Sequence, residues 1–245
     1  MMMSKKYQNK NCVYCVDEKA EDGDHIIARQ FIPVDKRAYL PKVPSCKKCN
    51  NIKSKLEIYL TTILPFGSNA PGAKEMLKTM VPPRLENNFK LKKSLQVGAH
   101  NVWVKPSDSD IIQRSMTLPI EGEKLIELLR MIIRGLSFYH WKVVIPKNYR
   151  VDVYALPLEG LIHFRDKIEP NFFKENSVEG NIGDGCFQYI GAKHAALSTL
   201  SCWEMSFYDV HLTGSGQKIP GPLYFCGTIG PAEPVSKKDL SLPNI

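Results

Sequence analysis

The sequence of 245 residues has no long apolar run. None of its hydrophobic stretches approaches the roughly 20 residues that a membrane-spanning helix needs, so no transmembrane segment is expected. The basic start, MMMSKKYQNKNC, has no apolar segment behind it, which argues against a secretory signal. Internal repeats and low-complexity tracts are lacking as well. These absences lead us to expect a cytoplasmic, globular protein with no membrane partner.

Cysteines are sparse outside one region. Three of the seven, Cys186, Cys202 and Cys226, are dispersed without motif spacing, which is typical of reduced, buried thiols. The other four form two Cys-x-x-Cys pairs near the start: Cys12 with Cys15, and Cys46 with Cys49. A spacer of two residues lets both sulfurs of a pair reach one ion, and four thiolates bind zinc tetrahedrally. The pattern therefore predicts one structural zinc, which contributes folding free energy rather than chemistry.

Acidic residues are scarce in the first part of the chain. Residues 1–100 hold 18 Lys and Arg against 9 Asp and Glu, whereas residues 101–245 hold 15 against 16. The net charge of +8 therefore lies wholly in the segment that carries the cysteine pairs. Lys and Arg side chains neutralise phosphates and release counterions, which drives binding to nucleic acid. We expect a nucleic-acid partner for this segment.

A carboxylate, an imidazole and an amide accompany the cysteine pairs. Asp24 and His25 are adjacent between the two pairs, and Asn50 follows the last cysteine directly. A carboxylate and an imidazole together can hold a metal ion and activate a water molecule. An imidazole also suits a general base near neutral pH. Asp22 is an alternative to Asp24 as ligand, and Asn51 is an alternative to Asn50.

These motifs carry a resemblance to a known family. The stretch CVYC…DHIIARQF…VPSCKKCNNIKS, within residues 10 to 60, resembles the zinc-stapled branch of the HNH endonucleases. The resemblance implies a ββα-metal, treble-clef-like module in which Asp24 and Asn50 bind a catalytic ion and His25 is the general base. Mg²⁺ or Mn²⁺ suits such oxygen ligands. Nine positions before Asn50 the family often has Asn, but this chain has Pro41, so that loop must be ordered in another way.

The resemblance implies hydrolysis of phosphodiester bonds in DNA. RNA is the alternative substrate, and a zinc-stabilised binding module that has lost catalysis is the alternative class. By analogy, bacterial nucleases of this kind serve in antiphage defence or mobile elements. An activating protein partner or a homo-oligomer is compatible with this interpretation. We expect Glu57 to be exposed, and we expect phosphate contacts from four lysines: Lys47, Lys48, Lys53 and Lys55.

The expected fold class is α+β. The nuclease-like module should span residues 1–66, followed by a basic connector (67–98), a mixed α+β domain that positions substrate or partner (99–230) and a loosely attached tail (231–245). Hydrophobic periodicity predicts the following elements: helices over 47–64, 73–80, 125–136 and 159–168, and strands within 99–118 and over 149–156, 185–192 and 202–212, the last with a bend after Phe207. Arg130 and Arg134, one turn apart, are expected on a solvated helix face, and the aromatic cluster around His140 in the core.

Overall fold

A five-stranded antiparallel sheet, in the order β5-β9-β8-β7-β6, lies at the centre of the structure. The computed structural model describes residues 6–104, 111–167, 177–194, 197–210 and 223–231. The strands of the sheet are β5 (Tyr149–Leu156), β6 (Ser177–Ile182), β7 (Phe187–Lys193), β8 (Ser201–Phe207) and β9 (Tyr224–Pro231). Two antiparallel pairs complete the described strands: β1 (Asp22–His25) with β2 (Lys42–Ser45), and β3 (His100–Val104) with β4 (Gln113–Thr117).

Helices surround this sheet and connect its parts. The described α-helices are α1 (Lys47–Ile63), α2 (Pro71–Thr79), α3 (Val81–Asn87), α4 (Phe89–Gly98), α5 (Gly122–Trp141) and α6 (Leu158–Lys167). Three short 3₁₀ turns are η1 (Arg29–Phe31), η2 (Val34–Lys36) and η3 (Leu64–Gly67). The protein is therefore of mixed α+β class, as the sequence predicts. Among the described residues, no helix combines the length and apolarity needed to cross a membrane.

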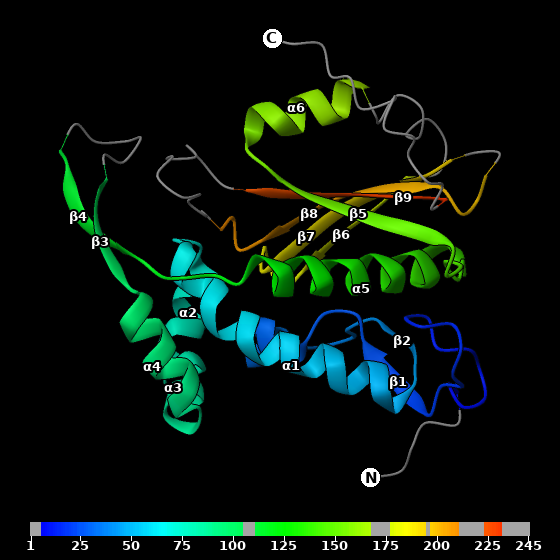
Figure 1. The fold of residues 1–245 in the computed structure, drawn as a ribbon, viewed down its shortest axis with the longest axis horizontal. Coiled ribbons are helices and arrows are strands. Elements are labelled where there is room, and N and C mark those ends of the chain that lie inside the picture. The colour runs from blue at the N-terminus through cyan, green and yellow to red at the C-terminus, as the bar shows by residue number, and fades with distance from the viewer. Residues whose placement is uncertain (1–5, 105–110, 168–176, 195–196, 211–222, 232–245) are drawn as a thin grey trace.

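The elements stack in layers, which Figure 1 shows from the side. Helix α6 covers one face of the sheet, α5 covers the opposite face, and α1 with the β1–β2 pair lies beyond α5. Helix α5 is mostly buried between Leu125 and Ser137 because it faces the sheet on one side and α1 on the other. Gly227 of β9 packs against Ile133, and Gly135 packs against Ile26. One hydrophobic cluster runs from the cysteine region through α5 into β8 and β9. The division of the chain at residues 66 and 98 stays a prediction.

Helix α1 follows the predicted pattern closely. It begins directly after Cys46, whose sulfur accepts a hydrogen bond from the Cys49 amide at 3.4 Å and so caps the helix. Tyr59, Leu60 and Ile63 are buried, and the chain leaves the α-helix at the 3₁₀ turn that contains Pro65. Ile52, although apolar, is 45% exposed near the start of the helix. The helix therefore presents its C-terminal half to the apolar core.

The segment expected to be a basic connector is mostly helical. In the sequence, Pro82 and Pro83 suggest an interruption of helical structure, yet they lie in the first turn of α3. Proline is tolerated there because the amides of the first turn have no partner within the helix. Asn88 then caps α4 by accepting the Leu91 amide at 3.1 Å. Residues 81–98 thus form two short helices.

The second half agrees with the sequence at its strongest patterns. Strand β5 has the predicted bounds, and α5 and α6 lie within a few residues of theirs. The predicted bend after Phe207 is a turn in which Tyr208 and Asp209 have φ values of 51° and 50°. Strands β6 and β9 were not predicted. Pro231 ends β9, and the rest of the expected tail lies outside the described residues.

Candidate metal centre and active site

The four cysteines of the two pairs meet at one point. Their sulfur atoms all lie within 4.8 Å of one another, and the Cys15 and Cys46 sulfurs are 3.9 Å apart. A tetrahedral zinc with bonds of about 2.3 Å separates its sulfur ligands by about 3.8 Å. The spacing and the all-thiol donor set therefore fit zinc, and the cluster could hold a structural ion of this kind.

Local backbone geometry brings the two pairs together. Strands β1 and β2 pair directly, with Asp22 opposite Ser45 and His25 opposite Lys42, so the second pair follows at the end of β2. The first pair is fixed to the same place because the Val13 amide donates to the Pro44 carbonyl at 3.1 Å. The turn after Cys15 puts Val16 at a φ of 67°, which a β-branched residue rarely adopts. Its surroundings must hold this turn in place.

Burial affects the protonation of the thiols. It raises the pKa of Cys46 to about 12 and raises the pKa of Cys49 as well. Without a metal these thiols stay protonated at neutral pH, and an ion that binds all four must displace protons. Metal binding at this cluster is therefore expected to weaken as the pH falls.

Asp24 is buried and already has two hydrogen-bond donors. Its Oδ2 atom accepts from the Tyr14 hydroxyl at 2.8 Å and lies 3.1 Å from the Lys53 ammonium. Tyr14 has its pKa raised well above the ordinary value, first by burial and then by the neighbouring Asp24 charge. The carboxylate is thus held in one orientation at the end of β1.

Lys53 links Asp24 to His25 and Glu57. Its side chain is 0% exposed, and its ammonium donates to the His25 carbonyl at 2.6 Å and to Glu57 one turn along α1. The prediction that Lys53 contacts phosphate is wrong, because a fully buried ammonium cannot reach nucleic acid. The prediction that Glu57 is exposed is also wrong: its side chain is 13% exposed, and burial raises its pKa to about 7 against the opposing charge of Lys53.

His25 borders this buried ion-pair group, which consists of Asp24, Lys53 and Glu57. Burial, followed by the charge of Lys42, lowers the pKa of His25 to about 4, so the imidazole is neutral at pH 7. Asn50 is half-buried and precedes Lys53 by one helical turn, which puts it on the face of α1 that meets β1. Asn51 is exposed, and the choice of Asn50 over this alternative stays a prediction.

The side chains of Asp24 and Asn50 fit a hard cation only in part. Carboxylate and amide oxygens are the donors that Mg²⁺ and Mn²⁺ take. The Oδ2 atom of Asp24, however, already serves Tyr14 and the Lys53 ammonium. A divalent ion on this carboxylate would have to share it with Lys53 or displace that ammonium.

The loop that contains Pro41 is fastened through the backbone. The Ile26 amide, directly after His25, donates to the Pro41 carbonyl at 3.0 Å. Arg37 donates from Nε to the Ile32 carbonyl at 2.9 Å within the same loop. Hydrogen bonds to main-chain carbonyls, one from a backbone amide and one from the Arg37 side chain, therefore hold this segment next to His25.

The remaining lysines expected at the nucleic-acid surface lie on the outside of α1. Lys47, Lys48 and Lys55 are all exposed, near the start and middle of the helix. Their positions are compatible with phosphate contact, and that role stays a prediction.

A cavity of about 470 Å³ lies between the cysteine cluster, α5 and β5. Arg130 and Arg134 line it; the side chain of Arg130 keeps 43% exposure, as the expected solvated face implies, and both guanidinium groups also bond to main-chain carbonyls. Arg130 donates to the Val151 carbonyl at 3.1 Å, and Arg134 donates to the Ile145 carbonyl at 3.0 Å. Both therefore tie α5 to the segment at β5. One feature of these sites had a signal in the sequence, namely the i, i+4 spacing of Lys53 and Glu57, whereas the carbonyl partners of the arginines had none.

His140, expected in the aromatic core, lies there. Its Nε2 atom is 2.8 Å from the Tyr189 hydroxyl, and its ring contacts those of Trp141 and Trp203.

No protein-family model, curated protein or solved structure matches this chain.

Proposed function

We propose that this protein is a metal-dependent endonuclease of the HNH type that hydrolyses phosphodiester bonds in DNA. The observation that carries the proposal is the placement of Asp24 and His25 at the end of β1, against the first turns of α1 and beside four clustered thiols. The four-thiol cluster would hold a structural zinc. A setting in bacterial defence or a mobile element remains an analogy with the family.

In this proposal His25 takes a proton from the attacking water. Its lowered pKa keeps the ring neutral at pH 7, which leaves a nitrogen able to accept that proton. Lys53 bonds to the His25 carbonyl and so fixes the backbone from which the imidazole projects. General-base catalysis of this kind depends on geometry, and the buried ion-pair group supplies the rigidity.

Asp24 and Asn50 would hold the divalent ion, Mg²⁺ or Mn²⁺. When bound, this ion stabilises negative charge on the phosphate and on the leaving oxygen. Tyr14 orients the Asp24 carboxylate by donating to it. Lys47, Lys48 and Lys55 would neutralise neighbouring phosphates and position the strand.

The experiment is a cleavage assay on plasmid DNA, with RNA as a second substrate. We expect nicking or linearisation with Mg²⁺ or Mn²⁺ and none without added divalent ion. Asp24→Asn keeps the shape of the side chain but removes its charge, so it should abolish cleavage. Cleavage of RNA alone would change the substrate class, and metal-independent cleavage by the Asp24→Asn variant would contradict the proposal.

A second candidate function is a nucleic-acid or partner-binding module without catalysis. The observation that favours it is the ion pair between Asp24 and Lys53, because the ammonium already occupies one side of the proposed metal ligand. This candidate predicts salt-dependent DNA binding by the wild type and no cleavage with any divalent ion. The same assay, run beside a binding titration, separates the two functions.

A further inference from the structure

The outer face of the central sheet contains a cavity of about 540 Å³, far from the proposed nuclease site. It lies on the side opposite α5. Helix α6 covers one end of this face, where Leu161 and Phe164 pack with Ala192, Cys202 and Cys226. The remaining end is hollow, and its volume is in the range of small-molecule sites.

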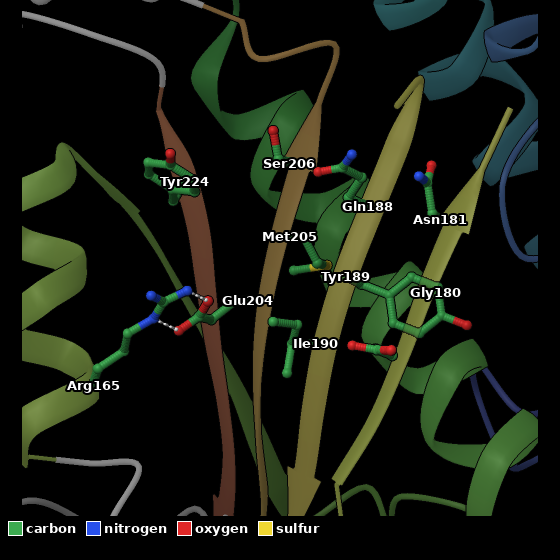
Figure 2. Close-up of a pocket in the computed structure, with 11 residues that line it drawn as sticks. Arg165, Gly180, Asn181, Gln188, Tyr189, Ile190, Glu204, Met205, Ser206 and Tyr224 are labelled. Carbon is green, nitrogen blue, oxygen red and sulfur yellow. Dashed lines mark hydrogen bonds and ion pairs between the residues drawn. The ribbon is translucent and has the colours of Figure 1, made fainter. Parts of the chain in front are cut away.

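The cavity contains an unbroken row of hydrogen-bonding side chains. Asn181 of β6 lies opposite Gln188 of β7, and Gln188 lies opposite Ser206 of β8. Tyr224 of β9 continues the row, and Figure 2 shows the four residues in line across the strands. With strands about 4.8 Å apart, such a row is about 14 Å long. Gln188 offers an amide donor and an amide acceptor, whereas the Asn181 oxygen already accepts from the Gly185 amide at 2.7 Å and the Ser206 hydroxyl donates to Asp209 at 3.3 Å.

The floor of the cavity contains polar side chains that are buried and held in place by hydrogen bonds. Glu204 is 5% exposed, and both of its oxygens accept from Arg165 of α6, at 2.8 and 2.7 Å. Ser206 is 6% exposed. Ile190 of β7 lies between β6, which carries Glu179, and β8, which carries Glu204. A bidentate pair fixes the plane of the guanidinium and of the carboxylate. A sheet face that only meets water does not require such burial of polar groups.

The charges of the cavity disfavour an anion. The charged side chains among its described lining residues are Arg165, Glu179 and Glu204. Because Arg165 is bonded to Glu204, Glu179 leaves the lining with a negative balance. Electrostatic complementarity therefore favours a neutral ligand over one that carries phosphate or carboxylate.

We propose that this cavity binds a nucleobase or nucleoside without phosphate. The Gln188 amide can pair with a base edge that presents a donor beside an acceptor, as amides do with adenine. The Arg165 guanidinium and the Tyr224 ring at the rim are the kinds of side chain on which bases stack. Ile190 gives the flat ring an apolar surface. The amide of Gln188 and the aromatic rim match this class, and the negative balance disfavours its phosphorylated forms.

The test is calorimetric titration of the full-length, zinc-loaded protein with adenosine, guanosine, cytidine and uridine. The 5′-monophosphates form a second arm, and glucose and maltose form a third. We expect at least one nucleoside to bind with a dissociation constant of millimolar or tighter, and its monophosphate to bind more weakly. Tighter binding of the monophosphate, or binding of the sugars in place of nucleosides, would overturn the proposal.

Gln188→Ala is the decisive variant because Gln188 is exposed and its loss should leave the fold intact. Loss of one bidentate base contact should weaken nucleoside binding by about 5- to 150-fold. Asn101→Ala, which removes an exposed amide from β3 outside the cavity, should bind like the wild type. Equal binding by Gln188→Ala and wild type, or no nucleoside binding at millimolar concentration, would refute the site. Neither result bears on DNA cleavage.

Discussion

Replacing Lys53 with Met should destabilise the protein strongly. Methionine keeps the apolar stem of lysine but removes the ammonium, which leaves Asp24 and Glu57 without their shared cation. Breaking a buried ion pair from one side costs about 3–5 kcal/mol. Since the Asp24 and Glu57 side chains keep 10% and 13% exposure, we expect the lower end, about 3 kcal/mol. With a urea dependence of about 3 kcal/mol per molar, the midpoint should fall by about 1 M.

The assay is urea unfolding of zinc-loaded protein, followed by tryptophan fluorescence, at pH 8 and pH 5. The loss should be smaller at pH 5, because carboxylates left without a cation can then take up protons and become neutral. Lys55→Met, an exposed position on the same helix, is the matched control and should change stability by less than about 0.5 kcal/mol. A cost below about 1 kcal/mol at pH 8, in the range typical of an exposed ion pair, would refute the buried ion-pair group.

Elemental analysis of protein never exposed to chelator should find about one zinc per chain, and Cys46→Ser should lose the metal and unfold the cysteine region; fully folded, zinc-free protein would contradict this. The pKa of Glu57 in the native protein is about 7, above its ordinary value of 4.5. Between these pH values the native protein holds a proton on Glu57 that the unfolded chain has released, so the free energy of unfolding falls as the pH rises through this window. Thermal melts should therefore show Glu57→Gln gaining on the wild type from about pH 4.5 to pH 7; a constant difference would mean that Glu57 is not shifted. Joint replacement of Lys47, Lys48 and Lys55 by Ala should reduce the salt dependence of DNA binding by about 2–3 in log–log slope, whereas Lys193→Ala should not change it.

The strongest sequence patterns predicted the elements that pack against the core. The period of apolar residues in α5 is regular over many turns because both of its neighbours, α1 and the sheet, are apolar. The two Cys-x-x-Cys pairs predicted a cluster that the structure brings within 4.8 Å. Such patterns are local, and local patterns survive folding when the tertiary contacts agree with them.

Other features depended on residues distant in the chain. The sequence alone makes Lys53 look like one of several surface lysines, but its partners, Asp24 and the His25 carbonyl, come from strand β1, with His25 lying 28 residues earlier in the chain. Strand β6 alternates polar residues with Val178, Gly180 and Ile182, and Gly180 interrupts this short apolar pattern, whereas β9 is recognisable only beside β5 and β8. The Arg165–Glu204 pair likewise joins a helix to a strand 39 residues later. Sequence spacing cannot show such pairs before the sheet is assembled.

Cleavage of plasmid DNA by wild type and His25→Ala, with Mg²⁺ or Mn²⁺, tests the proposed nuclease most directly. Removing the imidazole takes away the proposed base and leaves the four thiols and the surface lysines unchanged. We expect the cleavage rate to fall by at least about 10²-fold while zinc content and DNA affinity persist. His163→Ala, an exposed histidine on α6, should cleave like the wild type. Equal cleavage by wild type and His25→Ala, or no cleavage by the wild type with any divalent ion, would contradict the assignment of His25 as the general base.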